Sequence, residues 1–244
     1  MLDGTNWFYL LSRILTGARR IAEILADEVE PAPVLIHCSD GWDRTSQLSS
    51  LAQLLLDPYF RTFEGFQILI CKEWLSYGHQ FALRGGHNYG GREDPEQESP
   101  IFLQFLDCVY QLTVQFPTSF EFSETMLSFL HEAMCQCRFG TFLMNCERER
   151  EEGQLPLRTR SVWEYLSEHR EDYVNVFYQP TVTEGVCFLC PRTNIPNLTL
   201  WREYYFKYLE SSPTPYTLLT QAARKLKQSN TPDSRHNSKL VRSF

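Results

Sequence analysis

The residues His37–Thr45 contain the strongest chemical signal in the sequence: they read HCSDGWDRT, with five residues between Cys38 and Arg44. A short loop between a strand and a helix turns backbone N–H groups inward and can bind an anion, and the helix N-terminus adds partial positive charge. The planar guanidinium of Arg44 can hold two phosphate oxygens. The same field lowers the pKa of a thiol at the base of the loop. The spacing therefore predicts that Cys38 is a thiolate that attacks phosphorus.

Phosphoryl transfer also needs an acid for the leaving oxygen, and later a base for water. Asp43 and Asp40 are the nearest carboxylic acids, and we favour Asp43 because it adjoins Arg44. The alternative is that both carboxylates only cap N–H groups of the loop. The hydroxyl of Thr45 either hydrogen-bonds the sulfur of Cys38 or belongs to an ordinary first helical turn.

The elements around this loop follow from apolar spacing. Residues 7–27 predict an amphipathic helix, Val34–Ile36 predict a strand buried on both faces, and residues 45–56 predict a second helix. Further helices are expected near 66–77, 100–117, 123–134, 161–171 and 198–209. The sequence therefore predicts an α/β fold with a helix-rich C-terminal half. The strand at 34–37 has only weak candidate partners, at 173–178 and 185–189. Because a buried strand needs neighbours, we expect the chain to be a partial domain.

Charge and apolar patterning argue against a nucleic-acid-binding, secreted or membrane-spanning protein. The formal net charge of −7 argues against nucleic-acid binding. The first residues are acidic, the helix after them is amphipathic, and no apolar run approaches the length of a membrane span. We therefore expect a cytoplasmic protein whose eight cysteines are reduced. Residues 211–244 are polar and basic, and we expect a disordered tail there.

Other candidate groups have simpler explanations. The pairs Cys135/Cys137 and Cys187/Cys190 could supply four zinc thiolates, but buried free thiols are commoner, and we expect no metal. His79 either touches phosphate or hydrogen-bonds at a helix end, and the same alternatives apply to His87.

His37–Gln47 resembles the active-site signature of the myotubularin family, phosphoinositide 3-phosphatases with a tyrosine-phosphatase-like fold. The similarity covers roughly Trp7–Leu209 and includes many separate motifs in one order. These motifs are Leu54–Thr62, Glu64–Phe66, Lys72–His79, Ser99–Phe105, Phe116–Phe122, Cys137–Phe142 and Trp201–Tyr208.

The resemblance implies a role for each residue of the loop. By it, Cys38 is the nucleophile, Arg44 binds the 3-phosphate and Asp43 is the acid. Contacts to the substrate are expected from Ser39, Asp40, Gly41, Trp42, Thr45 and Arg84. No metal and no cofactor is implied. Residues 1–210 would be the C-terminal portion of the phosphatase domain, without its upstream sheet and lipid-binding PH-GRAM module.

The implied substrates are phosphatidylinositol 3-phosphate and phosphatidylinositol 3,5-bisphosphate. The resemblance also implies peripheral association with endosomal-type membranes and homo- or hetero-oligomers with family members. Active members often carry Lys or Arg where this chain has Gln80, so we expect a reduced advantage for the bisphosphate. Two alternatives remain open: a truncated, weakly active or inactive scaffold protein, and a protein-tyrosine phosphatase.

Overall fold

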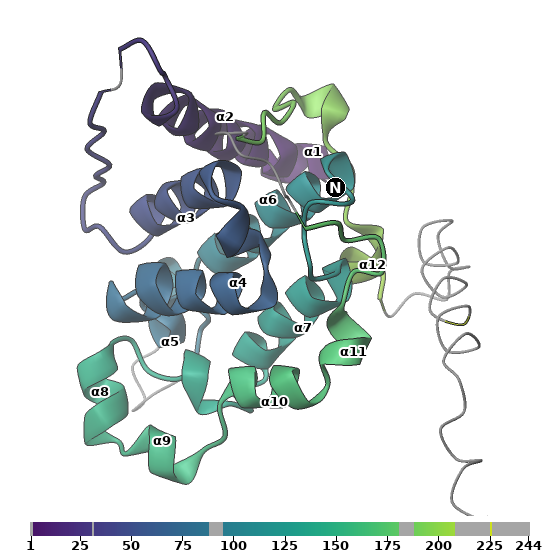
Figure 1. Ribbon diagram of the computed structural model, residues 1–244. Coiled ribbons are helices and arrows are strands. Elements are labelled where there is room, and N and C mark those ends of the chain that lie inside the picture. Colours follow the sequence, from purple (N-terminus) through teal and green to yellow (C-terminus); the bar gives the residue numbers. More distant parts are fainter. Residues whose placement is uncertain (1, 31, 88–94, 181–187, 208–224, 226–244) are drawn as a thin grey trace, which may run out of the picture. The chain divides into compact units, whose positions relative to one another are not determined.

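The computed structural model describes residues 2–30, 32–87, 95–180, 188–207 and 225, and the chain divides into two units, Met1–Tyr205 and Phe206–Phe244. The first unit is built from helices (Figure 1). The α-helices are α1 (Leu2–Thr5), α2 (Trp7–Leu25), α3 (Arg44–Leu56), α4 (Phe63–Ile70), α5 (Phe81–Arg84), α6 (Ile101–Gln115), α7 (Glu124–Cys135), α8 (Glu147–Glu152), α9 (Leu155–Arg158), α10 (Val162–Glu168), α11 (Arg170–Tyr173) and α12 (Arg202–Tyr205). Short turns of 3₁₀-helix are η1 (Pro58–Arg61), η3 (Pro95–Gln97), η4 (Gly140–Phe142) and η5 (Ile195–Asn197), and η2 (Cys71–Ser76) is a turn of π-helix.

Three helices form the part of the core that supports the loop before α3. Helix α2 buries Leu11, Leu15 and Ala18 against α3 and α6, and α3 in turn buries Leu51 and Leu55. Each of these side chains recurs at a spacing of three or four residues, so one face of each helix is apolar. This packing fixes the position of the N-terminus of α3.

An aromatic cluster lies beneath the segment that follows α4. The π-helical turn η2 carries Trp74, which is fully buried and contacts Phe102, Phe105 and Phe81 at ring-centroid distances of 5.1, 4.9 and 6.4 Å. A π-helical turn inserts one extra residue and is often found at functional sites. Here it leads directly into His79, at the edge of the cluster.

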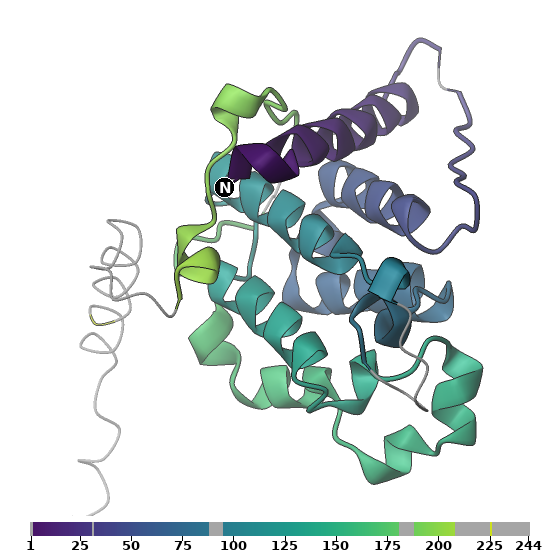
Figure 2. The same cartoon turned by 180° about the vertical axis from the view of Figure 1, so that it is seen from behind.

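The predicted strand at 34–37 is absent. Residues 32–38 are extended but form no β-ladder, and the side chain of Leu35 is 87% exposed. In both views the segment leaves the end of α2, runs along the side of the unit and returns to α3 (Figure 1 and Figure 2). A strand is defined by backbone hydrogen bonds to a neighbour, and the described residues supply none, so the prediction of a buried strand was wrong.

The α/β part of the fold class is therefore not confirmed. Among the described residues the β-type pairing is one antiparallel bridge, between Phe122 and Val174. The weak strand candidate at 173–178 contributes only this bridge, and most of the candidate at 185–189 lies outside the described residues.

Most of the predicted helices are confirmed, with differences at their ends. The helix expected from residue 161 begins as α10, and Ser161 caps it by accepting a hydrogen bond from the Trp163 amide. Ser123 occupies the N-cap position of α7 but accepts no capping bond, and α6 begins one residue later than expected because Pro100 is its N-cap. The expected helix over 198–209 is reduced to α12 (Arg202–Tyr205).

The predicted division of the chain stays a prediction. The tail at 211–244 lies outside the described residues except for Lys225, so the boundary at 210 is untested. Among the described residues, no helix has both the length and the apolar character needed to cross a bilayer.

Candidate functional site

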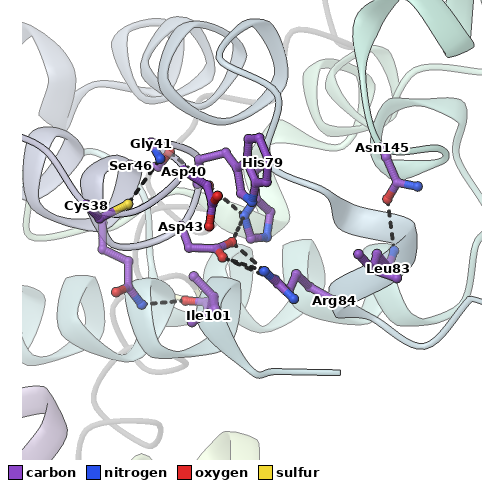
Figure 3. A network of polar contacts seen from close by, with 12 residues as sticks. Cys38, Asp40, Gly41, Asp43, Ser46, His79, Leu83, Arg84, Ile101 and Asn145 are labelled. Atoms are coloured by element: carbon purple, nitrogen blue, oxygen red, sulfur yellow. Dashed lines mark hydrogen bonds and ion pairs between the residues drawn. The ribbon is translucent and has the colours of Figure 1, made fainter. Parts of the chain in front are cut away.

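The loop at residues 37–45, here called the reactive loop, turns at Gly41. Its backbone has φ +93°, a conformation that favours glycine, and this turn brings the amide of Gly41 back over Cys38. The N–H of Gly41 donates to the sulfur of Cys38 at 3.1 Å (Figure 3). The chain then enters α3, whose first residue is Arg44. The thiol therefore lies within the turn, next to the N-terminus of a helix of 13 residues.

The thiol of Cys38 is poised to ionise at neutral pH. Partial burial raises the pKa of Cys38, but hydrogen bonds from the hydroxyl of Thr45 and from the backbone amides of Gly41, Asp40 and Thr45 outweigh it and lower this pKa to about 7. The buried hydroxyl oxygen of Thr45 has no other partner among the described residues. These donors converge on the sulfur, so a thiolate is a large fraction of the population near pH 7.

Arg44 closes the other side of the loop through Ser39. Its Nη2 donates to Ser39 Oγ at 2.9 Å, and Ser39 Oγ donates to Asp40 Oδ2 at 2.9 Å. All three side chains are exposed. The guanidinium of Arg44 is thus turned back toward the loop and is accessible to a ligand from solvent.

Asp43 lies at the opposite end of the loop, between two basic side chains (Figure 3). Its Oδ2 is 2.8 Å from Nη2 of Arg84, and its Oδ1 is 3.0 Å from Nδ1 of His79. Burial raises the pKa of Asp43, but the hydrogen bonds from His79 and Arg84, together with the charge of Arg84, outweigh it and hold this pKa below its usual value. In this state Asp43 is a carboxylate.

Arg84 contacts the loop through Asp43. Besides this ion pair, its Nη1 donates to the backbone and side-chain oxygens of Gln97 at 2.8 and 2.9 Å. Gln80 precedes α5 as its N-cap and has non-helical backbone angles, and Arg84 is the last residue of that helix.

Trp42 contributes backbone rather than side-chain contacts. Its carbonyl oxygen accepts hydrogen bonds from Nδ1 of His79 at 2.9 Å and from Oγ of Ser46 at 3.2 Å. Its indole nitrogen is buried and has no hydrogen-bond partner among the described residues. The indole therefore gives the loop bulk, and its carbonyl anchors the loop to the segment before α5.

The structure brings the predicted residues into three groups. Cys38, Gly41 and Thr45 meet at the sulfur, Ser39 and Asp40 form a chain with Arg44, and Asp43 pairs with Arg84. The roles of these residues in catalysis and binding stay predictions.

The contact of His79 with the loop was not predicted from the sequence. This residue is separated from Trp42 by 37 positions, so no spacing rule connects them. The available signal was its position directly after an apolar helix and a glycine, which is typical of a helix-terminal hydrogen bonder. No bond joins His87 to the loop in the part of the chain that the structure describes.

The cysteine pairs differ from the expectation of buried thiols. Cys135 and Cys137 are exposed free thiols, because α7 ends at Cys135 and the following turn faces solvent, and Cys190 is also an exposed free thiol. Cys187 lies outside the described residues. No cluster of three or more His, Cys, Asp or Glu side chains suited to a metal occurs among the described residues.

Comparisons with known proteins identify the family of this chain. A family model for the myotubularin-like phosphatase domain matches residues 1–151. Myotubularin of Rattus norvegicus is 46% identical over 207 residues, which are 85% of this chain and 33% of that protein. The phosphatidylinositol-3,5-bisphosphate 3-phosphatase MTMR6 of Mus musculus is 44% identical over 207 residues, with the same shares. The chain thus spans about a third of the length of these relatives. By the family match and these identities, the chain belongs to the myotubularin family of phosphatases.

Proposed function

We propose that this chain carries the reacting groups of a phosphoinositide 3-phosphatase. The observation that supports this most directly is the sulfur of Cys38, which accepts the Gly41 N–H at 3.1 Å and has a pKa lowered to about 7. The substrates are phosphatidylinositol 3-phosphate and phosphatidylinositol 3,5-bisphosphate. The mouse relative supports this substrate class, because it is a phosphatidylinositol-3,5-bisphosphate 3-phosphatase.

The first chemical step transfers the phosphoryl group to the enzyme. The thiolate of Cys38 attacks phosphorus, an S–P bond forms, and the bond between phosphorus and the inositol O3 breaks. The leaving oxygen takes a proton from the carboxylic acid of Asp43, which becomes a carboxylate. The guanidinium of Arg44 and the loop amides stabilise the charge on the transferred oxygens.

The second step releases inorganic phosphate. Water attacks the cysteinyl-phosphate, the Asp43 carboxylate takes its proton, and the S–P bond breaks to restore the thiolate. The cycle returns both residues to their starting protonation states, and it requires no metal or cofactor.

Asp43 must hold a proton before the first step, although the ion pair with Arg84 favours its carboxylate. The phosphate of the substrate is a stronger partner for a guanidinium than a carboxylate that can be protonated. When Arg84 binds the substrate, Asp43 loses a cation and its pKa rises. Substrate binding thereby produces the acid that the reaction needs.

The substrate class also suggests where the enzyme works. Phosphoinositides are membrane lipids, so we propose that the protein associates peripherally with the cytosolic face of endosomal-type membranes. Homo- or hetero-oligomers with family members are part of the same proposal, supported by the resemblance alone.

Phosphate release by the full-length protein tests the proposal. Short-chain phosphatidylinositol 3-phosphate and 3,5-bisphosphate are compared with a phosphotyrosine peptide, with Cys38→Ser as the inactive control. We expect release from the lipids that Cys38→Ser reduces to background. Release from the peptide alone would make the protein a tyrosine phosphatase, and no release from any substrate would favour a scaffold role.

A further inference from the structure

His79 is buried beside the reactive loop although it lies far from the loop in sequence. It is 1% exposed, and its ring meets Trp74 and Phe81 edge to face at centroid distances of 4.8 and 4.7 Å. Aromatic walls of this kind fix the orientation of an imidazole. The backbone also constrains the residue, because the His79 amide donates to the carbonyl of Trp74 at 2.8 Å.

The hydrogen bonds of His79 determine which ring nitrogen carries a proton. Nδ1 lies 2.9 Å from the carbonyl oxygen of Trp42 and 3.0 Å from Oδ1 of Asp43. A carbonyl oxygen can only accept, so Nδ1 must be the donor. His79 therefore presents an N–H to the backbone and to the carboxylate of two consecutive loop residues.

We propose that His79 is a positioning residue for Asp43, which holds one carboxylate oxygen and the neighbouring carbonyl so that the other oxygen faces the leaving group. This inference rests on the proposed function, because it assigns Asp43 as the acid. It separates the two neighbours of Asp43: Arg84 is the partner that the substrate displaces, and His79 is the partner that stays.

The packing of the two neighbours supports this division. His79 is fully buried between aromatic rings, whereas the side chain of Arg84 is 16% exposed and is held by polar contacts to Asp43 and Gln97. Among the described residues, the charged or titratable groups in contact with Asp43 are His79 and Arg84. A cavity of about 270 Å³ borders both of them, and its other titratable lining residues are Glu98, His131 and Cys135.

Two substitutions distinguish a positioned N–H from mere bulk. The amide nitrogen of His79→Asn lies near the place of Nδ1, whereas that of His79→Gln lies near the place of Nε2. We expect His79→Asn to keep kcat within about threefold. We expect His79→Gln to lower kcat by about 10- to 100-fold with KM little changed. This loss is smaller than the full contribution of a general acid, because Asp43 is still present but is no longer held in position. Equal losses in both variants would overturn the proposal.

A second measurement does not depend on turnover. We expect ¹³C NMR titration of the Asp43 carboxyl to give a higher pKa in His79→Gln than in the wild type, and an intermediate or unchanged pKa in His79→Asn. An Asp43 pKa that is the same in all three proteins would overturn the inference even if the enzyme is active. If the wild type releases no phosphate but the pKa follows this order, His79 positions Asp43 and the proposed function is wrong.

Discussion

Asp43 lies between two basic neighbours, and they set how its pKa responds to substitution. Nδ1 of His79 is on one side, fixed by its aromatic walls, and Nη2 of Arg84 is on the other. Both lower the pKa of Asp43 against the effect of burial. The pKa of Asp43 is therefore lowest when both partners are in place, before the substrate binds.

Replacement of Arg84 by Met tests this ion pair. The pKa of Asp43 is lower in the folded protein than in the unfolded chain. The ion pair therefore stabilises the fold at pH values above the pKa of an unfolded aspartate. This stabilisation is lost as the pH falls through the pKa of Asp43 in the folded protein. We expect Arg84→Met to lower the free energy of unfolding by about 1–3 kcal/mol at neutral pH. Urea titrations at neutral and strongly acidic pH should show the difference shrinking in acid.

The exposed pair Arg148–Glu152 supplies the control, since its side chains are 79% and 69% exposed and its atoms are 3.7 Å apart. Arg148→Met should change the stability very little at either pH. A loss for Arg84→Met that is independent of pH would contradict the ion-pair explanation.

The family resemblance implies a Lys or Arg in many active members where this chain has Gln80. A cation there should strengthen the contact with a second phosphate, by about 0.5–1 kcal/mol for a partly exposed group, which is about two- to fivefold. We expect Gln80→Lys to raise kcat/KM for the bisphosphate relative to the monophosphate by that factor. Gln136→Lys adds the same charge at an exposed position after α7, and an equal effect there would refute a specific contact.

The site could be predicted from the sequence only where its residues are neighbours in the chain. Cys38 and Arg44 lie at the two ends of one loop with five residues between them, so their spacing was informative. Arg84 was identified through the family resemblance, but its pairing with Asp43 was not. His79 reaches the loop because η2 and the aromatic cluster place it there, and a single histidine carries no sequence signal of such packing.

At the scale of elements, close contact between backbones limits what the chain tolerates. A Cβ atom at Gly65 in α4 would lie 1.9 Å from the carbonyl oxygen of Tyr59 and 2.9 Å from Cα of Phe60. These are main-chain atoms of η1, which cannot rotate away. The contact explains why a glycine is needed inside this helix, despite the cost of glycine to helix stability.

Gly65→Ala should therefore lower the free energy of unfolding by about 1–3 kcal/mol through overpacking. Thermal and urea unfolding monitored by circular dichroism measure the change. Gly4→Ala is the matched control, because nothing lies within 4 Å of an added Cβ there. Equal stability of the two variants would contradict the backbone-contact argument.

The helices were easier to predict than the strand for a physical reason. A helix makes its backbone hydrogen bonds within one segment, so the apolar periodicity of residues 7–25 and 44–56 was sufficient. A strand depends on partners elsewhere, and Val34–Ile36 has the composition of a strand without a partner among the described residues. The short helices α8 and α9 were missed because neither buries a periodic apolar face.

At the scale of the whole molecule, family membership supports the tyrosine-phosphatase-like part of the fold class, while the chain spans about a third of its relatives. Within the first unit, the ends are joined at one buried carboxylate. Asp107 Oδ2 accepts from Nε1 of Trp7 at 2.8 Å and from the hydroxyl of Tyr205 at 2.9 Å, and Gln111 donates to Oδ1. Burial raises the pKa of Asp107, so these donors offset the cost of a charge in the interior.

This carboxylate has a kinetic consequence. Its two partners are 100 and 98 residues away along the chain, in opposite directions. Closing loops of that length has a high entropic cost, so such contacts tend to form after the rate-limiting barrier of folding. Trp7→Phe, which removes one donor worth about 1–2 kcal/mol, should speed unfolding about five- to thirtyfold and leave refolding nearly unchanged. Stopped-flow chevrons would show one limb moving, and a slower folding limb instead would mean that the two ends meet early.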